Sequence, residues 1–262
     1  MGKLLKVKNL TKIYYEGSIA NKVVDDISLE VDEGEFVMVM GASGSGKTSL
    51  LHLIAGIDQP DGGKISYLQS SAAGDREIDF GHMSEKAKAM FRRSNIGIVF
   101  QQQCLIPDLT VYENIMLPMM LDRKRKEKIS MKDRILELCE QFGLKEHAGK
   151  YPSQLSGGQQ QRAAILRAIV NKPPVLLCDE PTGSLNSAQT DIVMEILEEL
   201  NRKGQTVVLV THDTKVAVRG KCIIYIEDGR AEGELRFDEP AGKEPYKQRE
   251  EELMSFLQKR GW

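Results

Sequence analysis

The chain has 262 residues, a formal net charge of −2 and a hydrophobic fraction of 41%. This length and composition allow a full buried core, either in one large α/β domain or in a core with a subdomain. The near-neutral charge argues against a bulk nucleic-acid binder, because such proteins usually carry a basic surface. No apolar run approaches the ~18 to 20 residues that a membrane-spanning helix needs, and no hydrophobic signal core follows the first residues. We therefore expect a cytoplasmic protein.

The N-terminal region is expected to form antiparallel strands over residues 4–10, 23–31, 64–68 and 77–80. In the second of these, Ile27, Leu29 and Val31 alternate with polar neighbours, which is the period of a strand with one buried face. A Ser-, Ala- and Gly-rich stretch at residues 69–76 is interpreted as the loop between the last two strands.

A glycine-rich segment lies between a predicted strand and a predicted helix. The apolar run at residues 36–40 is typical of a strand buried on both faces of a parallel sheet, and residues 48–55 have the pattern of a helix that ends before Gly56. Glycines at such a turn let backbone N–H groups surround an anion, and the helix N-terminus adds a positive dipole end. Lys47 can then reach the outer phosphates of a nucleotide, and Thr48 can bind Mg²⁺. The predicted phosphate loop consists of Gly41, Ala42, Ser43, Gly44, Ser45, Gly46, Lys47, Thr48 and Ser49.

A mainly helical insert is expected over about residues 102–171, after a strand at residues 96–100. Its first helix begins with a capping-box pattern, Thr110 and Glu113, and is expected to end at Pro118. The charged residues 122–128 are interpreted as a solvated loop rather than as a membrane-surface segment. The next helix is expected to end at Gly143 and to bury a stripe made of Met131, Ile135, Leu138, Cys139 and Phe142.

The motif Leu155-Ser156-Gly157-Gly158-Gln159 precedes a further predicted helix, at about residues 159–170. Ser156 and Gln159 have the spacing of a capping box. Gly157 and Gly158 would therefore leave the first backbone N–H groups of this helix free for an anion.

Two apolar strands in the C-terminal half end at polar residues. Residues 175–178 lead into Asp179 and Glu180, and residues 206–210 lead to His212. Acidic groups at the end of such a strand supply what phosphate hydrolysis needs, a metal ligand and a group that orients water. A helix between the two strands, stopped by Gly204, is expected to bury one face made of Ile192, Val193, Ile196, Leu197 and Leu200.

The phosphate loop and the later Leu155–Gln159 motif together resemble the ATP-binding cassette (ABC) family, over essentially residues 3–230. A phosphate loop alone is shared by many nucleotide-binding proteins, but this second motif downstream of one is nearly confined to ABC ATPases. The resemblance implies an α/β fold: a mixed, mainly parallel sheet with flanking helices, an N-terminal antiparallel β portion and an α-helical signature subdomain. It implies one nucleotide-binding domain at residues 1–237 and an extension at residues 238–262. It also implies an ATPase that uses ATP and Mg²⁺.

The resemblance further implies roles for single residues. Asp179 matches the family's Mg²⁺ ligand, Glu180 matches the carboxylate that polarises the attacking water, and His212 matches the switch histidine. Gln101 is similar to the Q-loop glutamine that senses Mg²⁺ and links the catalytic core to the helical subdomain. Three consecutive glutamines leave this register open by one residue.

An aromatic ring near the N-terminus completes the implied nucleotide site. Tyr14 lies where the family stacks a ring on adenine, and Tyr15 is the competing assignment. Stacking on a base needs only a presented aromatic face, so either ring is chemically suitable.

The resemblance also implies partners. In the family each signature motif faces ATP on the other subunit's phosphate loop, which implies a head-to-tail homodimer around two ATP molecules with Ser156, Gly157, Gly158 and Gln159 at the nucleotide. The sequence of residues 100–118 resembles the corresponding region of ATPases of the macrolide-export, lipoprotein-release and bacitracin-resistance type. Those ATPases work with separate integral-membrane permeases. The expected place is therefore the inner face of the cell membrane, with no nucleic acid bound. Residues 102–118 are expected to receive a cytoplasmic helix of the permease.

The alternative is a non-transport ABC ATPase that acts on nucleic acid or the ribosome. DNA-repair and chromosome-structure members of the family separate the two motifs by very long coiled coils, and translation factors normally carry two cassettes. This chain has a short gap between the motifs and one cassette, which argues against both classes.

One position departs from the family pattern: Asn186 stands where an aspartate is usual. This residue is implied to contact across the dimer, so the change bears on hydrolytic activity.

The C-terminal part is expected to contain a strand at residues 222–226, a turn at Asp228 and Gly229, and a linker at residues 238–243. A short final helix should pack on the chain's own core through a face made of Tyr246, Leu253, Met254 and Leu257. The cysteines have no metal-binding spacing and are interpreted as small buried or partly buried residues: Cys104, Cys139, Cys178 and Cys222.

Overall fold

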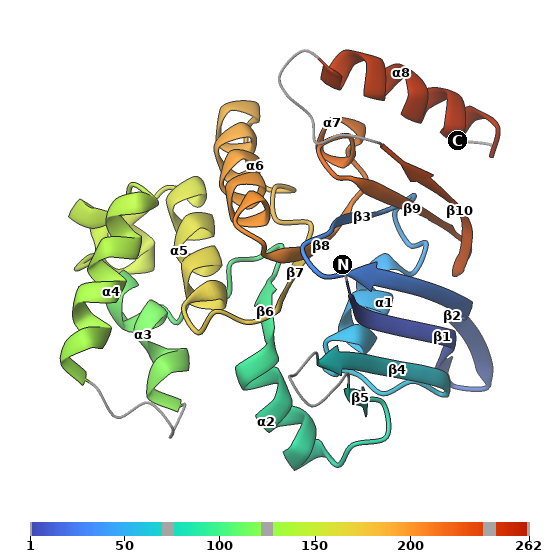
Figure 1. Ribbon diagram of the computed structural model, residues 1–262, viewed down its shortest axis with the longest axis horizontal. Helices are drawn as coiled ribbons and strands as arrows, with labels where there is room; N and C mark the ends of the chain where they lie inside the picture. Colours follow the sequence, from blue (N-terminus) through green and yellow to red (C-terminus); the bar gives the residue numbers. More distant parts are fainter. Residues whose placement is uncertain (1, 70–75, 122–127, 238–244, 261–262) are drawn as a thin grey trace. The chain divides into compact units, whose positions relative to one another are not determined.

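The computed structural model describes residues 2–69, 76–121, 128–237 and 245–260. Figure 1 shows their helices and strands in chain order. The chain forms two compact units, the first from residues 1–88 and 201–262 and the second from residues 89–200. Most of the predicted loop at 69–76, the charged stretch up to residue 127 and the predicted linker at 238–243 lie outside the described residues.

The first unit contains an antiparallel sheet with the strand order β2-β1-β4-β5. Its strands are β1 (Lys3–Glu16), β2 (Ile19–Asp32), β4 (Gly62–Gln69) and β5 (Arg76–Asp79). The alternation of buried Ile27, Leu29 and Val31 is as predicted. β1 and β2 extend beyond the predicted bounds because their polar ends pair through the backbone down to Glu16 opposite Ile19, and polar side chains do not prevent such pairing.

The same unit contains strands in the order β10-β9-β3-β8. β3 (Phe36–Met40), β8 (Thr206–Thr211) and β9 (Cys222–Glu227) run parallel, and β10 (Arg230–Arg236) is antiparallel to β9. All residues of β3 and β8 are buried, as the unbroken apolar runs predict. The predicted turn between β9 and β10 is confirmed: Asp228 and Gly229 both have positive φ, at 45° and 79°.

The helix α8 (Pro245–Gln258) packs within the first unit, against α7 (Thr214–Ala217) (Figure 1). Leu253 and Leu257 are fully buried, which confirms the expected packing on the chain's own core. Arg249 is also buried, and its guanidinium donates to the carbonyl oxygens of Val218 and Gly220 at 3.2 Å. Met254 is exposed, contrary to expectation, because it lies beside the row of positions 249, 253 and 257 that faces the core.

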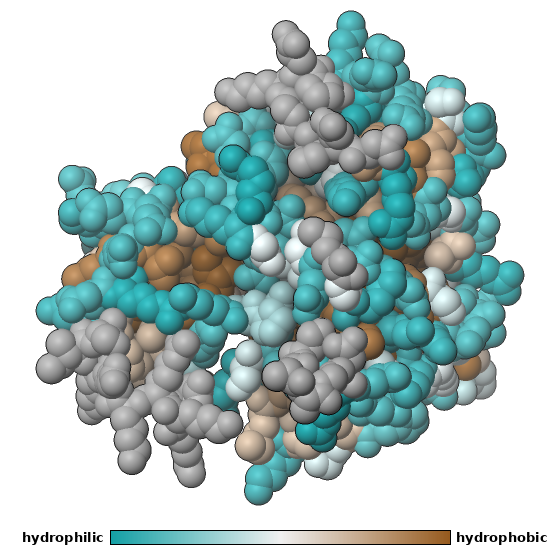
Figure 2. Space-filling view, in the orientation of Figure 1, coloured by the Kyte–Doolittle hydropathy of each residue, from teal (hydrophilic) through white to brown (hydrophobic). Residues whose placement is uncertain are grey.

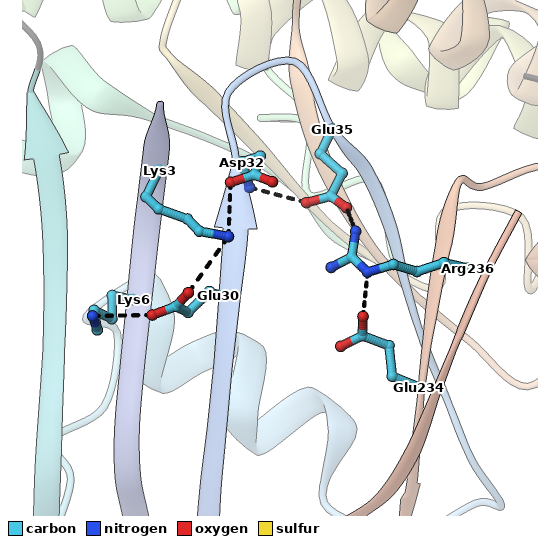
Figure 3. A network of polar contacts seen from close by, with 7 residues as sticks. All are labelled: Lys3, Lys6, Glu30, Asp32, Glu35, Glu234 and Arg236. Carbon is cyan, nitrogen blue, oxygen red and sulfur yellow. Dashed lines mark hydrogen bonds and ion pairs between the residues drawn. The ribbon is translucent and has the colours of Figure 1, made fainter. Parts of the chain in front are cut away.

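A polar network joins the edges of the first unit (Figure 3). Lys3 pairs with Asp32 at 2.9 Å and with Glu30 at 3.4 Å. The carboxylate of Glu35 is buried, accepts the backbone N–H of Asp32 at 2.9 Å and pairs with Arg236. The turn before β3 is thereby bound to the end of β10.

The second unit contains the parallel pair β6 (Ile96–Val99) and β7 (Val175–Asp179). The helix α2 (Glu85–Asn95) crosses from the first unit into the second along the chain. The other helical segments are α3 (Val111–Leu121), α4 (Lys128–Gln141), α5 (Gly157–Ile169), α6 (Ser187–Arg202) and the 3₁₀ turns η1 (Lys145–His147) and η2 (Pro152–Gln154). Within the described residues, no helix is both long and apolar enough to span a membrane.

One helix end was predicted wrongly. Pro118 lies inside α3 rather than at its end. A proline removes one helical hydrogen bond, but packing on both sides of it can keep the helix continuous. Here the buried row Val111, Ile115 and Met119 runs through the proline position.

Two side-chain environments also differ from expectation. Ile192 is exposed, since the buried face of α6 is centred on Val193, Met194 and Leu197. Cys104 is exposed in a loop, whereas the other three cysteines are buried. The predicted stripe of α4 is buried except for Leu138, which is half-buried. Gly143 follows that helix with a positive φ of 64°.

Candidate functional site

The phosphate loop connects β3 to α1 (Lys47–Ile54) and admits no side chain at two of its glycines. Gly46 has a φ of 98°, and a Cβ atom there would lie 2.2 Å from the carbonyl oxygen of Val23. A Cβ atom on Gly41 would lie 2.1 Å from the carbonyl oxygen of Ile226. The loop is therefore a cradle of backbone groups at a helix N-terminus, which suits the phosphates of a nucleotide.

Lys47 is drawn into this loop and is 4% exposed. Its ammonium donates to the carbonyl oxygens of Gly41 at 2.9 Å and Ala42 at 2.6 Å. Thr48, the next residue, is exposed, and Ser49 is half-buried. The loop thus holds a positive charge beside the backbone cradle.

Tyr14, also in the first unit, is held more firmly than Tyr15. The Tyr14 hydroxyl donates to Oδ2 of Asp58 at 2.7 Å, and the Lys12 ammonium lies 5.1 Å from the ring centroid. Tyr14 is 40% exposed and Tyr15 is 71% exposed. Partial burial raises the pKa of Tyr14, and its hydrogen bond to Asp58 raises that pKa further.

The acidic pair lies at the end of β7 in the second unit. Asp179 is buried, and Glu180 has a φ of 42°, in the left-handed region that non-glycine residues seldom adopt. Nε2 of Gln101 donates to Oε2 of Glu180 at 3.3 Å. A Cβ atom on Gly183 would lie 3.0 Å from this Gln101 nitrogen and 3.3 Å from the same Glu180 oxygen. Gln101, Glu180 and Gly183 therefore form one compact cluster, and backbone strain of this kind is concentrated at functional positions.

The predicted capping box of the signature helix is confirmed. The Ser156 hydroxyl accepts the backbone N–H of Gln159 at 3.3 Å, and Oε1 of Gln159 accepts the backbone N–H of Ser156 at 2.9 Å. The helix begins at Gly157, two residues earlier than expected. Its first two residues are glycines, and they face the segment after the acidic pair: Cβ atoms on Gly157 and Gly158 would lie 3.6 Å from Leu185 and 3.1 Å from Gln189.

Asn186 lies in that segment and caps α6. Its Oδ1 accepts the backbone N–H of Gln189 at 3.0 Å. Asparagine and aspartate cap helices about equally well, so the departure at this position leaves the local structure intact.

His212 follows β8 directly in the first unit and is exposed. The neighbouring Asp213 donates its backbone N–H to the Thr211 hydroxyl at 3.0 Å and accepts the backbone N–H of Lys215 at 2.8 Å. The histidine is thus held in a hydrogen-bonded turn between β8 and α7.

The segment between Gln101 and α3 presents apolar side chains. Leu105, Leu109 and Tyr112 are half-buried, and Ile106 is 38% exposed. Met120 and Leu121, at the end of α3, are exposed as well. Figure 2 shows further apolar surface on the second unit, in the region where Figure 1 places α4 and α5. The capping box of Thr110 and Glu113 is confirmed.

Sequence reasoning missed the residue that organises this segment. Asn114 is fully buried, and its side chain binds the backbone of Ile106, Leu109 and Thr110. A polar residue between the apolar Val111 and Ile115 is the signal that could have identified it. Asp58 and His147, which contact Tyr14 and Gln159, were missed as well. Neither lies near a recognisable motif.

A metal ion that arrives with a nucleotide needs oxygen donors, and side chains of both units offer them. Among the described residues, no group of three or more His, Cys, Asp or Glu side chains could hold a metal ion. Mg²⁺ in nucleotide sites is commonly bound through one or two carboxylates together with the phosphates. Thr48 in the first unit and Asp179 in the second each carry an oxygen of the kind that Mg²⁺ prefers.

Comparisons with known proteins agree with this chemistry. The family model described as ABC transporter matches residues 24–183, which include the phosphate loop, the signature motif and the acidic pair. An uncharacterised ABC transporter ATP-binding protein of Methanocaldococcus jannaschii, MJ1508, is 42% identical over 226 residues, covering 86% of this chain and 96% of that protein.

Two solved structures of the ATP-binding cassette MJ0796 are also similar, each with 40% sequence identity over 89% of this chain and 98% of theirs. One is a dimer in a post-hydrolysis state with ADP and Pi, with a TM-score of 0.79, and the other is a dimer with a TM-score of 0.80. The predicted α/β cassette fold is confirmed. The chain belongs to the ABC transporter family, in which it is an ATP-binding cassette with ATPase activity.

Proposed function

We propose that this cassette dimerises around two ATP molecules and uses their hydrolysis to drive a separate integral-membrane permease, in export or in resistance to drugs or antimicrobial peptides. One observation carries the link from hydrolysis to the membrane partner. Gln101 is hydrogen-bonded to Glu180, and it directly precedes the apolar segment at residues 102–118. A partner that displaces this segment would therefore act directly on the residue that contacts the hydrolytic carboxylate.

The proposed roles at the nucleotide follow the chemistry of each group. The backbone of the phosphate loop and Lys47 hold the phosphates, and Tyr14 stacks on the adenine. Thr48, Gln101 and Asp179 hold Mg²⁺, which would neutralise phosphate charge. Glu180 polarises the attacking water, and His212 assists at the terminal phosphate.

The dimer proposal is supported by the signature helix and by the dimers of MJ0796. Ser156 and Gln159 cap each other, so neither side chain occupies the glycine N–H groups between them, and these groups would meet the phosphates of ATP on a second copy of the chain. Residues 1–237 would act as one nucleotide-binding domain with a helical insert at about 102–171, and residues 238–262 as an extension.

The permease proposal is supported by exposed apolar side chains in the segment at residues 102–118 and directly after it. Ile106, Met120 and Leu121 are exposed there, and apolar patches on a protein surface often mark partner sites. Such a partner would place the chain in the cytoplasm, at the inner face of the cell membrane.

Two variants with matched exposure test the permease contact. Ile106 and Met254 are each 38% exposed, on the apolar segment and on α8 respectively. With Ile106→Glu, we expect loss of the membrane protein that co-purifies from detergent-solubilised native membranes, and loss of its effect on ATP hydrolysis. Met254→Glu should preserve both, and both purified variants should keep the basal ATPase rate. A complex that withstands Ile106→Glu contradicts the proposed docking surface.

A further inference from the structure

The orientation of the Gln159 side chain is decided by its own capping box. Its Oε1 accepts the backbone N–H of Ser156 at 2.9 Å, so its NH₂ group must point the other way. That group lies 2.9 Å from Nε2 of His147. An amide NH₂ group only donates hydrogen bonds, and Nε2 of His147 must therefore accept one.

This requirement selects one form of the imidazole. If Nε2 accepts, the proton of the neutral ring is on Nδ1. Reversing the Gln159 amide would place its NH₂ group against the Ser156 N–H and break the capping box. A doubly protonated ring would place two donors opposite each other, at Nε2 of His147 and at the Gln159 NH₂ group.

The backbone around His147 keeps the ring in place. The residues that follow η1 are bound to the first turn of α3: the carbonyl of Ala148 accepts the N–H of Tyr112 at 2.8 Å, and that of Lys150 accepts the N–H of Val111 at 2.9 Å. The N–H of Lys150 in turn donates to the carbonyl of His147 at 2.9 Å. The backbone that carries His147 is thus bound to a neighbouring helix, a support that a positioning group needs.

We propose that His147 is a positioning residue for the signature motif: it holds the Gln159 side chain, and through the capping box the first turn of α5, in the geometry that receives ATP from a second copy of the chain. The receiving role rests on the proposed function, while the hydrogen bond itself does not. His147 touches neither the nucleotide nor the acidic pair in this assignment. It acts only through Gln159.

The tautomer can be measured directly in the wild-type protein. Long-range ¹H–¹⁵N correlation spectra of ¹⁵N-histidine-labelled protein, recorded in mildly alkaline buffer where histidine is neutral, distinguish Nδ1–H from Nε2–H rings. The chain has four histidines, and the His147→Gln variant identifies the signal of this one. We expect the Nδ1–H form for His147, and an Nε2–H form would overturn the proposal.

The consequence for the signature is tested by substitution in a Glu180→Gln background, in which the ATP-bound dimer should accumulate. His147→Leu removes the acceptor and should weaken ATP-dependent dimerisation by about fivefold, the effect of one hydrogen bond. His147→Gln places a non-titrating acceptor near the position of Nε2 and should stay within about twofold of the parent. His82→Gln, at an exposed histidine paired with Asp79, is the matched control.

The outcomes separate the two proposals. If the parent dimerises with ATP and His147→Leu dimerises equally well, the positioning role is contradicted and the dimer proposal stands. If the parent itself fails to dimerise, the proposed function fails, and the tautomer measurement still decides whether His147 holds Gln159. Mant-ATP binding to each monomeric variant should be unchanged. If a His147 variant no longer binds mant-ATP, its weaker dimerisation comes from misfolding, and the positioning role of His147 is overturned.

Discussion

The hydroxyl group of Tyr14 donates a 2.7 Å hydrogen bond to Asp58, whose other carboxylate oxygen lies 3.0 Å from the Lys12 ammonium. Although burial alone would raise the pKa of Asp58, the hydrogen bonds from Tyr14 and Lys12 lower it, so the carboxylate is ionised and keeps both contacts. The same ammonium lies over the Tyr14 ring. The ring is therefore positioned by the chain itself before any base stacks on it.

This arrangement predicts which tyrosine stacks on adenine. Tyr14→Ala should weaken ATP binding at least about fivefold, since stacking of an aromatic ring on a base contributes about 1–3 kcal/mol. Tyr14→Phe keeps the ring but loses the Asp58 contact, so it should lower ATP affinity less than Tyr14→Ala does. Tyr15→Ala is the matched control, and titration with fluorescent ATP provides the measurement. A larger loss with Tyr15→Ala would assign the stacking role to Tyr15.

Glu180→Gln should abolish turnover while leaving ATP binding intact. The amide keeps an oxygen that can accept from Gln101, as Oε2 of Glu180 does at 3.3 Å, but it cannot take a proton from water. The ATPase rate should fall by about 100-fold or more, the usual contribution of a general base. Glu195→Gln, on the exposed side of α6, should retain the wild-type rate. A Glu180→Gln protein that hydrolyses ATP normally would remove this residue from the mechanism.

Lys47→Ala should act earlier, on nucleotide binding. It removes the only positive charge of the Gly41–Ser49 loop and leaves the carbonyl groups of Gly41 and Ala42 without this donor. Hydrogen bonds to charged groups contribute about 1.5–3 kcal/mol, so ATP affinity should fall by about tenfold or more. Calorimetric titration gives the affinity, and thermal unfolding shows whether the loop itself is perturbed. Unchanged affinity in a normally folded variant would count against the assignment.

Asn186→Asp should raise the basal ATPase rate of the isolated protein severalfold. The change keeps the cap on Gln189. In the proposed dimer, the added charge would strengthen hydrogen bonds to the other copy of the chain, because charged groups form hydrogen bonds roughly twice as strong as neutral ones. ATP affinity and the unfolding temperature should change little. An equal or lower rate would make Asn186 a neutral variation.

The final helix, α8, should contribute to the stability of the folded chain. Leu253 is fully buried, so Leu253→Ala is expected to lower the free energy of unfolding by about 2–5 kcal/mol, whereas Met254→Ala should change it by less than about 0.5 kcal/mol. Urea unfolding of the purified chain measures both. Equal, small effects would show that α8 does not pack firmly on the first unit.

The features that depend on near neighbours were predictable from the sequence. The phosphate loop, the capping boxes at Thr110 and Ser156 and the turn at Asp228 are each determined by residues within a few positions, since they arise from backbone conformation and short-range hydrogen bonds. The end of α3 was not predictable in this way, because the local preference of Pro118 was outweighed by the buried row on either side of it.

The positioning of the candidate site depends instead on residues that are far apart in the chain. Tyr14 and Asp58 are 44 positions apart, and Gln101 and Glu180 are 79 apart. Motifs name the groups that bind and hydrolyse a nucleotide, because those groups need particular chemistry at particular spacings. Their supporting partners are chosen by packing, which has no signature in local sequence. The sequence by itself therefore determined the family and its chemistry, and only the tertiary structure decided which side chains hold Tyr14, Glu180 and Gln159 in place.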